Sequence, residues 1–80
     1  MILVQQIKRR IVLELRHEPL NHYVLAAELR EPPFRVRAEL KALKRDRLVR
    51  DIYTSNGQHV WQLTERGERA AYETDQLELA

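Results

Sequence analysis

Positively charged side chains gather in the middle of this sequence, where they could bind a polyanion. Between Arg30 and Arg50 there are eight Lys and Arg residues against three Asp and Glu. Lys and Arg neutralise phosphate groups, and Arg can also bind guanine through two parallel hydrogen bonds. The residue types therefore indicate nucleic acid binding, with a solvated basic surface as the alternative.

The spacing of these cations would place most of them on one sector of a helix over residues 33–46. The apolar ridge of this helix, spread over about 60° at about 100° per residue, consists of Val36, Leu40 and Leu43. The basic stripe on the adjacent sector consists of Arg37, Lys41, Lys44 and Arg45. Glu39 and Asp46 lie on a different sector, together with Arg35. The stripe is therefore not interrupted by its own counterions.

Position along this helix separates two expected roles. A major groove about 12 Å wide admits one helix, whose N-terminal half faces the base edges. Arg35 and Arg37 lie in that half, so they are the expected base readers. The expected phosphate contacts are Lys41, Lys44, Arg45 and, in second rank, Arg50. For Arg50, an ordinary surface charge on a strand is the alternative.

Other residues that could carry chemistry form no recognisable site. The three histidines, His17, His22 and His59, have spacings that fit no familiar metal-ligand motif, so we expect surface histidines. Ser55 is the single serine and lacks an identifiable triad. Two glycines cannot build a phosphate-cradling loop, and without cysteine there is no thiolate. The sequence predicts no enzyme, metal or cofactor.

Length and composition limit the remaining possibilities. The 80 residues carry 14 Lys and Arg against 12 Asp and Glu, for a net charge of +2, and we expect one domain over residues 1–80. No apolar run approaches the roughly 18 residues that span a bilayer. Lys8, Arg9 and Arg10 stand where a signal peptide needs apolar residues. We therefore expect a cytoplasmic protein without a membrane partner.

Helical periodicity and capping signals predict the elements that position the basic stripe. Three helices are expected over residues 2–16, 22–30 and 33–46. Asn21 is a plausible N-cap of the second helix. The pair Pro32-Pro33 ends that helix, and Pro33 can open the third because its missing amide hydrogen costs nothing there.

Two strand-like runs predict a β-hairpin over residues 48–63. Between the runs, Asn56-Gly57 suits a two-residue type I′ turn. The resulting register pairs Ile52 with Trp61, as a core pair, and Tyr53 with Val60. The polar hairpin tip makes Asn56 an expected weak contact to nucleic acid. Thr64 would then cap a last helix over residues 65–75.

This order of elements predicts an α+β fold that is mainly helical: a winged helix-turn-helix with a three-helix core, a hairpin wing and a C-terminal helix. Three motifs make the resemblance specific: residues 25–29 (LAAEL), 40–49 (LKALKRDRLV) and 63–67 (LTERG). With Val36 they resemble the winged helix-turn-helix regulators of the bacterial MarR and PadR types over about residues 3–72. Arg47 departs from the pattern, because glycine is frequent there and a left-handed Arg would cost about 1 kcal/mol.

The resemblance implies a small transcriptional regulator that binds double-stranded DNA with helix 33–46 in the major groove. The alternative is a winged helix that serves only as a protein–protein interaction module, since fold alone does not fix function. Apolar residues without an assigned neighbour near the chain ends favour a homodimer. These residues are Ile2, Leu13, Tyr72, Leu77 and Leu79.

Overall fold

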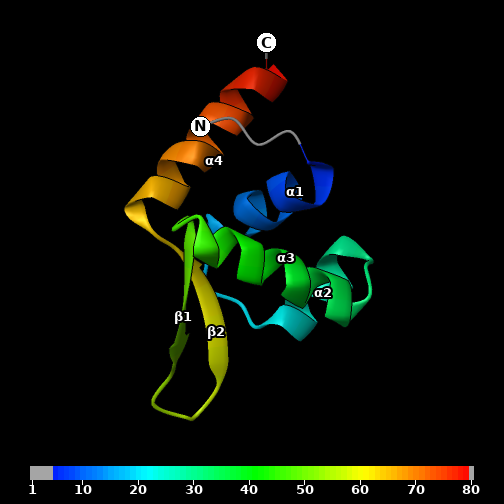
Figure 1. Cartoon of the computed structure of the whole chain (residues 1–80), viewed down its shortest axis with the longest axis vertical. Coiled ribbons are helices and arrows are strands. Elements are labelled where there is room, and N and C mark those ends of the chain that lie inside the picture. Colours follow the sequence, from blue (N-terminus) through cyan, green and yellow to red (C-terminus); the bar gives the residue numbers. More distant parts are fainter. Residues whose placement is uncertain (1–4, 80) are drawn as a thin grey trace.

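The structure, a computed structural model, describes the backbone of residues 5–79 and the side chains of residues 5–76 (Figure 1). Its elements in chain order are α1 (Gln6–Leu15), α2 (His22–Leu29), α3 (Pro33–Arg45), β1 (Val49–Tyr53), β2 (His59–Leu63) and α4 (Glu65–Leu79). The two strands form an antiparallel hairpin that projects from the helices, while α4 extends toward the opposite end of the molecule. This is the α+β architecture that the sequence predicts.

The apolar ridge of α3 lies at the centre of the core. Val36, Leu40 and Leu43 have no exposed surface, as predicted. They share the core with apolar side chains of every other element, among them Ile11 of α1 and Leu25 of α2. Because this ridge faces inward, the opposite side of α3 faces solvent.

Two arginines in left-handed conformations end α2 and α3. Arg30 has a φ of 56°, so α2 stops at Leu29, one residue before the predicted end. Arg47 has a φ of 64° after α3. The residue after each of these arginines donates a backbone hydrogen bond to the last turn of the helix. Glu31 N–H donates to Ala26 O over 3.0 Å, and Leu48 N–H donates to Leu43 O over 2.9 Å. This is the Schellman arrangement, in which glycine is the usual left-handed residue.

Arg47→Gly is expected to raise the free energy of unfolding by about 0.5 to 1 kcal/mol, because glycine adopts a positive φ without the steric cost of a Cβ. Chemical denaturation monitored by circular dichroism measures the change. Arg45→Gly is the matched control, since it places glycine inside α3 and should lower stability by about 1 kcal/mol. A loss of stability in both variants would contradict the strain assigned to Arg47.

The hairpin register differs by one residue from the predicted register. Ile52 pairs with Val60, and Asp51, rather than Ile52, pairs with Trp61. The turn is the cause: Gly57 N–H donates to Thr54 O over 2.9 Å, and Gly57 alone among the turn residues has a positive φ, of 79°. This geometry is a three-residue loop with a left-handed glycine at its end, not a type I′ turn.

The changed register also corrects the predicted Ile52–Trp61 core pair. Trp61 is 2% exposed and Ile52 is 37% exposed, because neighbouring strand residues point to opposite faces. Leu20, in the connection between α1 and α2, adds a short bridge to the other side of β2. It exchanges two backbone hydrogen bonds with Trp61, of 3.1 and 2.8 Å, which holds the start of α2 beside the hairpin.

The last helix is longer than predicted, since α4 continues past residue 75 to Leu79. Of the residues predicted to form a dimer, Tyr72 is 57% exposed and Leu13 is half-buried. Ile2 and the side chains of Leu77 and Leu79 lie outside the described residues, so the homodimer stays a prediction. No helix within the described residues is long and apolar enough to cross a membrane.

Candidate nucleic-acid interface

The solvent face of α3 carries a row of cations. Arg37, Lys41 and Arg45 are exposed, and Arg35 is exposed at the start of the helix. Within residues 5–76 none of these four side chains has an ion pair or a side-chain hydrogen bond. Their charges are therefore available to an anionic partner without the loss of an existing contact.

Lys44, the other member of the predicted stripe, is paired with the wing. Its Nζ lies 2.7 Å from Asp51 Oδ1 on β1, and Asp51 Oδ2 lies 2.8 Å from His59 Nε2 on β2. The hydrogen bond from Lys44, followed by that from His59, lowers the pKa of Asp51 to about 2. Asp51 thus joins the C-terminal half of α3 to both strands of the hairpin.

Sequence reasoning missed this three-residue cluster because it depends on the register. In the observed register Trp61 faces Asp51, so His59 lies diagonally across the hairpin on the same face. In the predicted register Asp51 would face Gln62, and His59 would point to the other face. The signal that could have found the cluster is Gly57 read as the end of a three-residue loop.

The two remaining predicted contacts lie elsewhere on the wing. Arg50 points to the opposite face of the hairpin from Asp51, and its Nε donates to Gln62 Oε1 over 2.7 Å. Asn56 is exposed at the tip of the loop. The structure therefore gathers Arg37, Lys41 and Arg45 on one helix face and leaves Arg50 and Asn56 at separate places on the hairpin.

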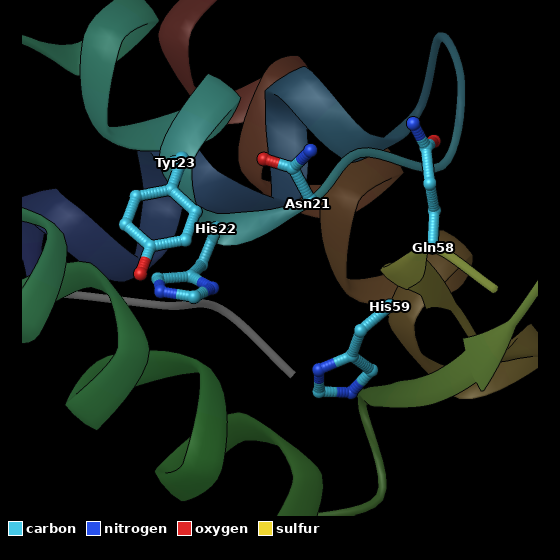
Figure 2. Close-up of a pocket in the computed structure, with 5 residues that line it drawn as sticks. All are labelled: Asn21, His22, Tyr23, Gln58 and His59. Atoms are coloured by element: carbon cyan, nitrogen blue, oxygen red, sulfur yellow. The ribbon is translucent and has the colours of Figure 1, made fainter.

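A pocket of about 170 Å³ lies between the start of α2 and the wing (Figure 2). It is lined by Asn21, His22, Tyr23, Gln58 and His59. Figure 2 shows the imidazole rings of His22 and His59 entering this space from opposite sides. Neither histidine belongs to the predicted site, because their distance in sequence gives no sign that α2 and β2 meet.

Aromatic contacts and the Asn21 cap fix this pocket. The rings of His22 and Tyr23 are 4.1 Å apart, and those of His59 and Tyr53 are stacked at 4.8 Å. Asn21 Oδ1 accepts a hydrogen bond of 2.8 Å from the backbone N–H of Val24, as an N-cap does. Both histidines are therefore held by neighbouring rings.

His22 lies in a positive environment. Partial burial lowers the pKa of His22 from its ordinary value, and electrostatic repulsion by Arg37 and then by the His59 ring lowers it further. The Arg37 guanidinium of α3 is therefore close enough to the pocket to act on His22. In the part of the chain that the structure describes, no group of three or more His, Cys, Asp or Glu residues could hold a metal ion.

Comparisons with known proteins support the fold. No protein-family model matches this chain, and no curated protein matches it. Wild-type ZitR of Lactococcus lactis, solved in complex with DNA, is similar with a TM-score of 0.81 and 22% identity, over 92% of this chain and 52% of ZitR. The adhesin competence repressor AdcR of Streptococcus pyogenes is similar with a TM-score of 0.86 and 18% identity, over 92% and 57% of the two chains.

The transcriptional regulator BldR of Sulfolobus solfataricus is a third similar structure, with a TM-score of 0.85 and 20% identity, over 90% of this chain and 53% of BldR. This chain therefore spans about half the length of each of these three proteins. At such low identities the likeness shows the fold, and it confirms the predicted winged helix.

Proposed function

We propose that this chain is the DNA-binding part of a transcriptional regulator, with α3 in the major groove of double-stranded DNA. The observation that carries the proposal is the row of exposed cations on the solvent face of α3, beside its buried ridge. A single helix fits the major groove, and cations along it can reach both bases and phosphates. The winged-helix fold supports DNA binding, since ZitR, whose fold is similar, has been solved in complex with DNA.

The position of each cation on α3 suggests its role. Arg35 and Arg37 lie in the first turns, where a helix in the groove meets base edges. Lys41 and Arg45 lie farther along, where phosphates are nearer. Lys44 would reach a phosphate only if its ion pair with Asp51 breaks. Its ammonium would then exchange one anionic partner for another.

The wing and its base would supply the outer contacts. Arg50 and Asn56 are exposed on the hairpin and would reach phosphates beside the groove that α3 occupies. Asp51 lies between α3 and the wing, and as long as Lys44 and His59 remain in contact with its carboxylate, they offset its repulsion of DNA.

A titration of labelled duplex at two salt concentrations tests the proposal. Neutralisation of several phosphates makes DNA affinity fall steeply as ionic strength rises, whereas an apolar protein–protein contact changes little. We expect binding at low salt that weakens strongly at physiological salt. Absence of binding at low salt by the folded protein would favour the protein-interaction alternative.

Arg37→Ala and Lys41→Ala are expected to differ in kind. Arg37→Ala removes an expected base contact, so it should weaken binding to the preferred duplex about tenfold and relax the preference at one base position. Lys41→Ala removes an expected phosphate contact, so it should weaken binding to all sequences alike. It should also lower the slope of log affinity against log salt concentration by about one. Lys41 suits this comparison better than Lys44, because removal of Lys44 also leaves Asp51 without its partner.

Binding of both variants to preferred and scrambled duplexes, measured by fluorescence anisotropy, makes the comparison. Both substitutions are at exposed positions of one helix, so equal thermal stability is the control for folding. Equal losses on every sequence would show that α3 contacts only the DNA backbone.

A further inference from the structure

The pocket between α2 and the wing collects hydrogen-bond donors beside the basic face of α3. None of its five lining residues is acidic. His22 comes from the first position of α2, and His59 from the first position of β2. Leu20 and Trp61 hold these two positions together through their paired backbone hydrogen bonds. The two imidazoles are therefore brought together by the fold itself.

The groups that face each histidine differ. His22 faces the Arg37 cation of α3, the His59 ring of β2 and the ring of Tyr23 beside it. His59 faces the Asp51 carboxylate and the Tyr53 ring, both of β1, and Lys44 of α3 pairs with the same carboxylate. Each oxygen of Asp51 thus already has a cationic or imidazole partner, and neither is directed at His22.

Of the two histidines in the pocket, His22 is consequently the one without a carboxylate partner among the described residues. Its surroundings are cationic, and no described residue accepts a hydrogen bond from its ring. A protonated imidazole with two N–H donors and no acceptor is completed by an anion. The Asn21 side chain is already used to cap α2, which leaves the histidine as the charged donor at this point.

We propose that this pocket binds one backbone phosphate of the DNA and that His22 donates to that phosphate as an imidazolium, so that DNA binding takes up a proton. The inference rests on the proposed function, because the phosphate belongs to the duplex that α3 reads. Phosphates line both edges of the major groove, and this pocket lies beside α3 within the electrostatic reach of Arg37.

The direction of the pH dependence follows from the charges. In the free protein, burial and the Arg37 cation favour the neutral ring. A phosphate brings a negative charge that favours the protonated ring, so the pKa of His22 is higher in the complex than in the free protein. By linkage, DNA affinity then increases as the pH falls through this range and is lowest at alkaline pH.

The experiment measures duplex affinity by fluorescence anisotropy at pH 8, 7 and 6 and at constant ionic strength. Uptake of one proton limits the change in duplex affinity to tenfold per pH unit. We expect affinity to increase about fivefold from pH 8 to pH 6. His22→Gln keeps a hydrogen-bonding side chain but does not titrate, so it should lose most of this gain. His17→Gln is the matched control: His17 is exposed and lies outside the pocket, and its variant should keep the full gain.

A second measurement follows the His22 ring directly by NMR. Its titration midpoint should rise by about one pH unit when duplex is added. An equal pH dependence in wild type, His22→Gln and His17→Gln, or an unmoved His22 midpoint, would overturn the inference and leave DNA binding intact. Failure of the folded wild type to bind at any pH would instead contradict the proposed function.

Discussion

Gly67→Ala is expected to destabilise the protein by about 2 kcal/mol, although alanine is the better helix former. A Cβ at residue 67 would lie 1.9 Å from the carbonyl oxygen of Leu48 and 2.9 Å from its carbonyl carbon. These are backbone atoms, so no side chain can rotate away. Overpacking against backbone atoms is expected to cost about 3 kcal/mol, the upper end of the usual range, and a gain of about 1 kcal/mol in helix propensity offsets part of this cost.

The surroundings of Gly67 leave little freedom for the backbone to move. Leu48 O accepts a hydrogen bond of 3.1 Å from Thr64 N–H. Thr64 Oγ1 donates to Arg47 O over 2.7 Å and accepts from Gly67 N–H over 3.0 Å. Thr64 therefore caps α4 and fastens it to the turn after α3, and displacement of α4 would break these bonds.

Urea denaturation of Gly67→Ala, with Glu68→Ala as control, measures the effect. Glu68 is exposed on the same helical turn, so its substitution should change stability by less than about 0.5 kcal/mol. A Gly67→Ala protein as stable as wild type would show that α4 is not seated against Leu48. The glycine of the 63–67 motif is thus explained by close packing and not by a turn.

Local patterns account for the parts of the fold that the sequence predicts well. The ridge of α3 follows from helical periodicity, because a period of 3.6 residues allows one phase that buries Val36, Leu40 and Leu43 together. The Asn21 and Thr64 caps are equally local, since each side chain binds an amide three residues ahead. Such features depend on neighbours within one turn and can be read without the tertiary structure.

The wing shows what local reasoning could not supply. Asn56-Gly57 is compatible both with a two-residue turn and with a longer loop that ends in a left-handed glycine. The two loops differ by one residue in length. A shift of one residue in the strand register moves every side chain of one strand to the other face of the hairpin. The Lys44–Asp51–His59 cluster depended on that choice.

The histidine pocket could not be predicted from the sequence, for another reason. His22 and His59 are far apart in the chain, and they meet because Leu20 pairs with Trp61. A single bridge leaves no periodic signal, so the sequence alone predicts an ordinary surface position for each histidine. The basic stripe of α3 needed no such contact, which explains why its exposure could be predicted and the pocket beside it could not.

The double substitution Arg37→Glu and Lys41→Glu is expected to weaken duplex binding by about 100-fold or more. Each reversal removes a contact and adds a repulsive charge on the face that would lie in the groove, and two such changes together correspond to about 2.7 kcal/mol or more. Both residues are exposed and without an ion pair among the described side chains, so the fold should keep its stability. Fluorescence anisotropy at low salt measures the loss.

The matched control places the same charges on α4, as Arg66→Glu and Arg69→Glu. Each substitution changes the charge by two units, so both double variants have a net charge of −2 instead of +2. Arg69 has only a weak, exposed pair with Glu65, at 3.6 Å, and α4 points away from the wing in Figure 1. If position on α3 decides binding, the α4 variant retains most of its affinity; equal losses would show that the duplex responds to net charge alone and that α3 is not the helix in the groove.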